Sequence, residues 1–144
     1  MKARRAAKAT LEYLILFAIG GGVYCLIELL WRRHTHWTMF LAGGLCFCLL
    51  GAINRRYEYG MSLIAQTVIG GLAITAVEFA FGLVLNVWLK LHIWDYSGLP
   101  HNLMGQVCLA YVYLWQWLSL VGIVLNDWTR HWLFGEQRPK YKIL

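Results

Sequence analysis

Four long apolar runs, separated by short polar segments, constrain this chain more than any other feature. They cover residues 11–31, 37–53, 62–91 and 103–125. A helix of about 20 apolar residues spans the hydrocarbon core of a bilayer, because each residue adds about 1.5 Å. We therefore predict an all-α, polytopic membrane protein, with four transmembrane helices in a single membrane domain over residues 1–144.

The overall composition and the two flanking segments agree with a membrane location. Hydrophobic residues make up 60% of the chain and charged ones 14%, whereas about a quarter of a soluble domain is charged. Residues 1–10 form a basic N-terminal tail, and the apolar run after them is longer than that of a signal peptide, so we expect it to be retained. Residues 127–144 mix Trp with Arg and Lys, which is typical of an interfacial basic tail.

The basic residues indicate an orientation. The N-terminal tail carries four Lys or Arg and the C-terminal tail four, while the segment 54–60 adds Arg55 and Arg56. Arg32, Arg33 and Lys90 lie on the other side. By the positive-inside rule, both termini are predicted to be cytoplasmic in a multi-pass protein of the cell membrane. The net charge of +6 then predicts contact with anionic membrane lipids and no nucleic-acid partner.

An internal repeat at a spacing of 50 residues predicts how the helices are arranged. Gly20-Gly21 is matched by Gly70-Gly71, and Glu28 is matched by Glu78. Each half holds two apolar runs, so the chain reads as two tandem helical hairpins that form a parallel pseudo-repeat. The alternative is that Gly pairs match by chance in a Gly-rich chain.

Glu28 and Glu78 are the strongest candidates for a functional site. Both lie well inside apolar runs, where a charged group costs several kcal/mol and usually faces a cavity or a partner. Arg32 follows Glu28 by one helical turn, and Asn86 follows Glu78 by two, so all four are candidate binding residues. One interpretation is an outward-facing polar cavity built on both acids. The other is that each acid is neutralised by neighbours and only holds helices together.

The segment 94–106, WDYSGLPHNLMGQ, places polar groups between two apolar runs. Its candidate binding residues, with one from the first outward loop, are Trp94, Asp95, Tyr96, Ser97, Asn102, Gln106 and His36. We expect either a binding lip over the Glu cavity or a capped turn, in which Asn102 caps the fourth helix.

Several kinds of chemistry have no motif in the sequence. The His residues of the outward loops lack an HxxxH spacing and the four Cys lack a CxxC, so no metal site and no cofactor are predicted. No nucleophile motif occurs, which leaves catalytic residues unidentified. No P-loop occurs either, so the chain does not hydrolyse ATP by that mechanism.

Beyond these patterns, the stretch from about Gly20 to Trp117 resembles the bacterial membrane family labelled "putative ABC-transporter type IV". The matching positions are Glu28, Arg32, His36, Gly44, Asn54, Glu78, Asn86, Trp94, Asp95, Tyr96, Ser97, Pro100, Asn102 and Gly105. The segment from Trp94 to Gln106 is the most specific part of this resemblance. The resemblance implies a permease subunit and leaves the substrate open.

Three functions remain open from the sequence. The first is a permease-like transport component that binds a small-molecule or lipid ligand and works with an ATPase subunit or as a homo-oligomer. The second is a membrane-embedded enzyme that acts on a lipid or another amphipathic substrate, with Glu28, Glu78 and Asp95 as its acids. The third is a non-catalytic membrane partner or sensor, in which the acids would be fully paired and no cavity would exist.

Overall fold

The computed structural model describes residues 1–144 and consists almost entirely of four long helices. Their bounds are α1 Lys2–Arg32, α2 Trp37–Tyr57, α3 Leu63–Gly82, continued by the π-helix η1 Leu83–Trp88, and α4 Leu109–Phe134. Two short strands, β1 Asn102–Leu103 and β2 Val107–Cys108, pair antiparallel. All four helices are long and apolar enough to cross a membrane. The predicted all-α architecture with four candidate spans is confirmed at this level.

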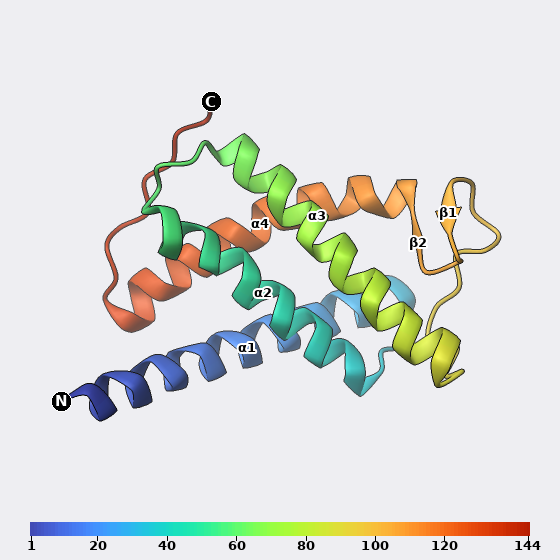
Figure 1. The fold of residues 1–144 in the computed structure, drawn as a ribbon, viewed down its shortest axis with the longest axis horizontal. Helices are drawn as coiled ribbons and strands as arrows, with labels where there is room; N and C mark the ends of the chain where they lie inside the picture. The colour runs from blue at the N-terminus through green and yellow to red at the C-terminus, as the bar shows by residue number, and fades with distance from the viewer.

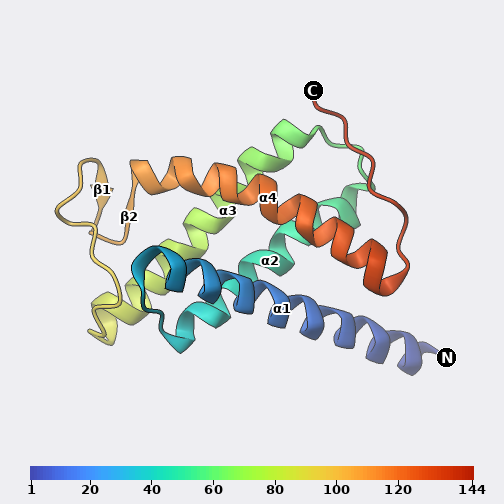
Figure 2. The same cartoon turned by 180° about the vertical axis from the view of Figure 1, so that it is seen from behind.

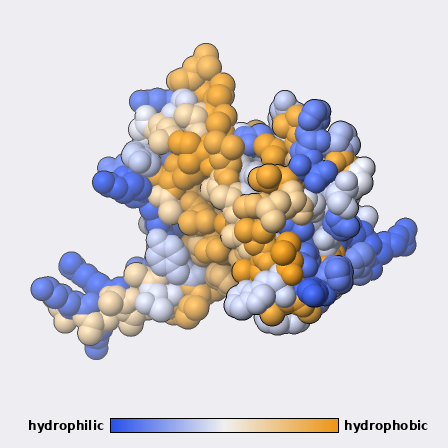
Figure 3. Space-filling view, turned by 45° about the vertical axis from the view of Figure 1, so that its right-hand side comes forward, coloured by the Kyte–Doolittle hydropathy of each residue, from blue (hydrophilic) through white to orange (hydrophobic).

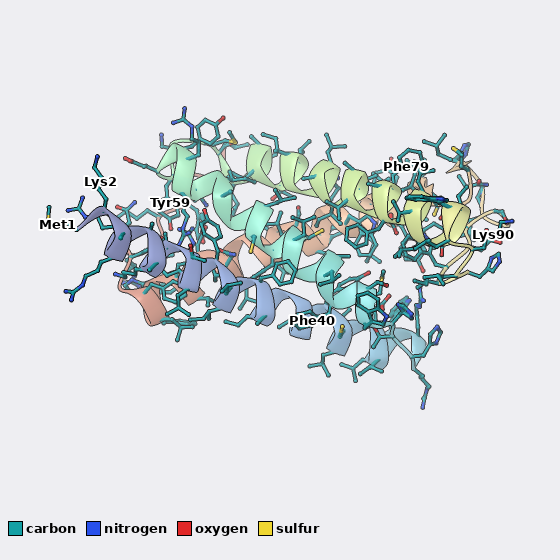
Figure 4. All side chains as sticks on the ribbon, turned by 60° about the horizontal axis from the view of Figure 1, so that its bottom comes forward. Met1, Lys2, Phe40, Tyr59, Phe79 and Lys90 are labelled. Carbon is teal, nitrogen blue, oxygen red and sulfur yellow. The ribbon has the colours of Figure 1, made fainter.

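The helices pack as two hairpins. The main contacts join α1 to α2 and α3 to α4, and α2 also packs against α3 and α4 (Figures 1 and 2). In Figure 4, Met1 and Tyr59 lie toward one end of the molecule and Lys90 toward the other. The predicted hairpin pairing is therefore confirmed. The pseudo-repeat between the hairpins and the cytoplasmic side of the termini stay predictions.

Glycines allow the helix backbones to approach closely. A Cβ atom added at Gly20 of α1 would lie 2.2 Å from Cβ of Phe47 on α2, and one added at Gly43 would lie 2.4 Å from Cβ of Tyr24. Such distances leave no room for a side chain. Small residues at helix contacts are the usual way to pack helices in a membrane, where lipid offers no hydrophobic driving force.

The surface follows the hydropathy expected of a membrane domain. Figure 3 shows hydrophobic side chains over the middle of the molecule and hydrophilic ones gathered toward its two ends. Many of the large hydrophobic side chains of the helices are exposed, among them Leu30, Leu72 and Val121. Exposed apolar side chains in a continuous band are what a bilayer solvates.

The fourth helix differs most from the expected bounds. It begins at Leu109 rather than at residue 103, because residues 102–108 form the small β1–β2 hairpin. At its other end it continues through residues 127–134, which we expected in a separate tail, and ends where Gly135 adopts φ 69°. No helix-breaking residue lies between Leu125 and Phe134, so the helix runs on until a glycine can take the left-handed conformation.

The first and third helices also differ from the apolar ranges. α1 begins at Lys2 and includes the basic segment before the apolar run. The third apolar run was expected to reach residue 91, but its helix widens into η1 and ends at Trp88. The widened turn is closed by a hydrogen bond from the Leu89 amide to the Val84 carbonyl at 2.9 Å. Single π-helical turns of this kind often occur near functional sites.

Candidate functional site

A cavity of about 120 Å³ lies among the four helices and contains both candidate acids. Of its 23 lining residues 17 are hydrophobic, so it is an apolar space with a few polar groups. The charged residues that line it are Glu28, Arg32 and Glu78, and the aromatic ones are Tyr24, Phe47, Phe81, Trp94, Tyr96 and Trp115. Glu28 comes from α1 and Glu78 from α3, so the two acids of the sequence repeat line one shared space.

Glu28 is buried and carries an ionic partner. Arg32, one turn further along α1, places Nη1 3.8 Å from Oε1 of Glu28. The Thr35 hydroxyl donates a hydrogen bond to Oε2 at 2.7 Å. Arg32 also donates to the Ile93 carbonyl at 3.1 Å, which ties the helix end to the long loop. The charge of Glu28 is thus balanced by Arg32 of the same helix.

Glu78 has a different set of partners. The Tyr96 hydroxyl donates to Oε1 at 2.8 Å, and the Trp115 indole donates from Nε1 to Oε2 at 2.8 Å. Both oxygens therefore accept hydrogen bonds from neutral groups, and these two bonds favour the ionised form of the carboxylate. No Lys, Arg or His nitrogen lies within salt-bridge distance of Glu78.

Tyr96 is held in place as a neutral donor. Its ring stacks on Tyr111 with the ring centroids 4.5 Å apart and the planes at 11°. Burial, followed by the nearby Glu78 carboxylate, raises the pKa of Tyr96 well above the ordinary value for a phenol. The hydroxyl therefore keeps its proton and its hydrogen bond to Glu78 through the ordinary pH range.

A buried hydrogen-bond network fixes the loop that carries Trp94 and Tyr96. The Trp94 indole donates to the Gln106 carbonyl at 2.9 Å, and Asn86 donates to Oε1 of Gln106 at 2.9 Å. Asn86 also accepts from the Ile93 amide at 2.7 Å. Asn86 belongs to η1, and its side-chain amide contacts the loop at Ile93 and Gln106. Asn86 and Gln106 thus shape the cavity wall without lining it.

Three of the sequence-predicted residues lie in the exposed part of the loop. Asp95 accepts a hydrogen bond from the Ser97 amide at 2.8 Å, and this bond lowers the pKa of Asp95. The expectation that Asn102 caps the fourth helix is wrong, because Cys108 is the N-cap of α4. Instead, Asn102 donates to the Leu99 carbonyl at 2.9 Å and accepts from the Gly105 amide at 3.0 Å. Neither Asp95, Ser97 nor Asn102 lines the cavity.

His36 also lies outside the cavity. It is the N-cap of α2, where its ring accepts a hydrogen bond from the Thr38 amide at 3.3 Å. Its Nδ1 is 2.7 Å from the Thr38 hydroxyl. His36 therefore starts α2 directly after the loop that joins it to α1. Five of the eleven candidate binding residues line the cavity directly: Glu28, Arg32, Glu78, Trp94 and Tyr96.

Sequence reasoning missed two aromatic residues of the cavity. Trp115 supplies one of the two donors to Glu78, yet 37 positions separate them and no local pattern links them. Tyr24 precedes Glu28 by four residues, so helical spacing alone places both side chains on one face of α1. That spacing could have identified Tyr24, whereas Trp115 required the packing of α4 on α3.

A second polar cluster, also missed, lies at the opposite end of the helices. Asp127 and Arg130 of α4 form a buried ion pair, and Arg130 also pairs with Glu136. Asn54 of α2 donates to Oδ2 of Asp127 at 2.6 Å, and the Tyr141 hydroxyl donates to the same oxygen at 3.0 Å. The spacing of Asp127 and Arg130 was a signal for such a pair, but only if the helix was known to continue past residue 125.

This cluster fastens the C-terminal segment onto the helices. After α4 ends, the chain returns along the start of α3, where the Leu63 amide donates to the Lys142 carbonyl at 2.7 Å. Burial and the Asp127 carboxylate raise the pKa of Tyr141 above the ordinary value, so its hydroxyl stays protonated and donates. The cluster does not line the cavity.

Comparison with known proteins identifies the family to which this chain belongs. No curated protein and no solved structure matches the chain. A family model does match, over residues 11–139, and this range includes both cavity acids, the loop above them and the buried ion pair of α4. Since the match covers most of the chain, the protein belongs to the family described as "Putative ABC-transporter type IV".

Proposed function

We propose that this protein is a permease-like component of a membrane transporter, and that the cavity between Glu28 and Glu78 holds the transported ligand. The observation that supports this most is that both acids line one apolar space. An isolated carboxylate at bilayer depth is costly, so two of them facing one cavity favour a polar ligand or ion there. Membership of the family agrees with this role.

The pairing of the acids favours ligand binding over a purely structural role. A non-catalytic partner or sensor would be expected to have fully paired acids and no cavity. Here Glu28 is paired with Arg32, whereas Glu78 accepts only from the neutral donors Tyr96 and Trp115. Glu78 can therefore interact with a charged ligand without first breaking an ion pair.

The small volume of the main cavity supports the proposal that transport needs further subunits. About 120 Å³ is small beside the pockets of about 300–1,000 Å³ that hold drug-sized ligands. The chain also carries no P-loop. We propose that an ATPase subunit, a second copy of the chain, or both complete the transport path in the cell membrane.

Native mass spectrometry of the protein, released gently from its own membranes, tests this function. We expect a complex with a P-loop ATPase or a homo-oligomer, and a discrete ligand mass retained on the chain. The Glu78→Gln variant should lose that mass, while the exposed Glu58→Gln variant should keep it. A monomer that retains no ligand would contradict the proposal, and release of a chemically altered ligand would instead favour the enzyme.

A further inference from the structure

The cavity has a side opening between α1 and α4. A second pocket of about 290 Å³ shares Glu28, Arg32, Tyr96 and Trp115 with the main cavity and extends outward from them. Figure 2 shows α1 and α4 on the same side of the molecule, in front of α2 and α3. Since α1 packs chiefly on α2 and α4 chiefly on α3, a slot remains between α1 and α4.

The slot opens at bilayer depth. Its outer walls are Ile27 and Trp31 of α1 and Leu114, Trp117 and Val121 of α4. All five are exposed hydrophobic side chains within the candidate spans. In a membrane these side chains contact lipid tails, so the slot connects the two acids with the hydrocarbon region rather than with water alone. A ligand that enters here needs an apolar portion.

The charges along this path favour a cation. Glu28 and Glu78 line the connected pockets, and Arg32 is the one basic side chain that lines either of them. Arg32 is already paired with Glu28, at 3.8 Å. One carboxylate, that of Glu78, is left without a positive partner. An anionic ligand would be repelled by it, and a neutral one would leave its charge uncompensated in an apolar space.

The aromatic side chains of the cavity also favour a positively charged ligand. Tyr96 and Trp115 both donate hydrogen bonds to Glu78, so their rings lie beside the carboxylate. Tyr24 and Trp94 line the same cavity. The faces of Trp and Tyr rings attract organic cations, and ammonium ligands are commonly bound by such rings together with a carboxylate.

We infer that the cavity binds a hydrophobic organic cation, an ammonium group carrying an apolar chain, which enters from the bilayer between α1 and α4. The ammonium group lies against Glu78 and the rings of Tyr96 and Trp115, and the chain lies in the slot. The inference rests on the proposed function, because it names the class of ligand for that same cavity.

Binding of three probes with the same decyl chain tests this inference. The probes are decyltrimethylammonium, decylphosphocholine and decyl sulfate, each added to the full chain in a neutral maltoside detergent and counted by native mass spectrometry. We expect the ammonium probe to bind about tenfold more tightly than either of the others, since it alone brings a positive charge to Glu78 without a negative one. The probes also separate a simple cation from the zwitterionic headgroup of a phospholipid.

Two variants test the charge and the path separately. Glu78→Gln removes the charge at nearly the same side-chain size, at the loss of one of the two hydrogen bonds, and should reduce ammonium affinity about tenfold. Leu114→Trp fills the slot without changing any charge, and Leu114 does not line the main cavity, so this variant should reduce binding of the ammonium probe even if Glu78→Gln does not fold. Glu58→Gln, which alters an exposed acid far from the cavity, is the control, and circular dichroism reports on folding.

The outcomes separate the two proposals. Equal binding of all three probes to wild type, or equal affinity of Glu78→Gln and wild type for the ammonium probe, overturns the cation inference and leaves a ligand cavity in place. No binding of any probe above the level of Leu114→Trp overturns the side entry and the cation inference together. The proposed transport function fails only if the native protein also retains no ligand of its own.

Discussion

The Trp115 indole donates a hydrogen bond to Oε2 of Glu78 at 2.8 Å, and this bond joins α4 to α3 inside the cavity. Glu78 is one of the two acids that the sequence repeat singles out. Its second oxygen accepts from Tyr96, which comes from the loop. The Glu78 carboxylate thus links α3, α4 and the loop that carries Tyr96.

Removing the indole donor should loosen this junction. In Trp115→Phe an aromatic ring remains, but the N–H donor and one of the two fused rings are lost, so one oxygen of Glu78 is left without a partner. We expect a loss of about 1–3 kcal/mol in the free energy of unfolding, measured in mixed micelles. Trp117→Phe is the matched control, because Trp117 is exposed and its loss should cost little. Equal stability of the two variants would contradict the role of Trp115.

Neighbouring glycines of α1 provide a test of helix packing. A Cβ at Gly20 would lie 2.2 Å from Phe47, whereas a Cβ at Gly22 would meet no atom within 4 Å. Gly20→Ala should therefore destabilise the α1–α2 pair by about 1–3 kcal/mol through overpacking. Gly22→Ala should be neutral or stabilising by up to about 1 kcal/mol through helix propensity. Unfolding in mixed micelles measures both, and a larger loss for Gly22→Ala would refute this packing.

The ion pair of α4 should behave as a coupled unit. Arg130→Met leaves the Asp127 carboxylate buried without its cation, which should cost about 3–5 kcal/mol of stability. Adding Asp127→Leu removes the stranded charge, so the double variant should be more stable than Arg130→Met alone. Arg138→Met changes an exposed arginine and serves as the control. A double variant less stable than Arg130→Met would show that the two residues are not coupled.

The loop bond between Asp95 and the Ser97 amide should depend on pH. Because the pKa of Asp95 is lowered in the folded chain, the stabilisation is complete above the unfolded value and is lost as the pH falls through the folded value. The Ser97 amide resonance should therefore shift only below about pH 4, the ordinary carboxyl range. NMR titration measures this, and Asp95→Asn should show no such shift. A midpoint at or above the ordinary value would disprove the bond.

The sequence predicted those features that depend on local or periodic patterns. Apolar run length identified the four helices, and the repeat identified Glu28 and Glu78. The ion pair of Glu28 with Arg32 follows from their spacing of one helical turn. The cavity partners of Glu78 could not be predicted, because Trp115 reaches it only through the packing of α4 on α3.

Helix ends and loop structure were predicted less well, for a physical reason. Hydropathy marks where a helix is apolar, but a helix ends where its backbone finds other partners. Asn102 forms hydrogen bonds with the backbone of Leu99 and Gly105 in the loop, and α4 begins only at Leu109. The Asp127–Arg130 pair neutralises its own charge, which lets α4 continue beyond the apolar run.

Glu28 and Glu78 line one cavity, and labelling stoichiometry tests whether they share that space. In a background where the four native cysteines are replaced by alanine, Glu28→Cys and Glu78→Cys are made singly and together. Each is treated with a flexible bifunctional bis-methanethiosulfonate, and the number of reagent molecules attached is counted by intact mass.

Two cysteines that line the same cavity can be bridged by one such molecule, because each of its two ends reacts with one thiol. We therefore predict one label on each single variant and one, not two, on the double variant. Glu28→Cys combined with Glu58→Cys is the control and should take two labels, because Glu58 follows α2 at the other end of the molecule. Two labels on the Glu28→Cys, Glu78→Cys variant would contradict the shared cavity.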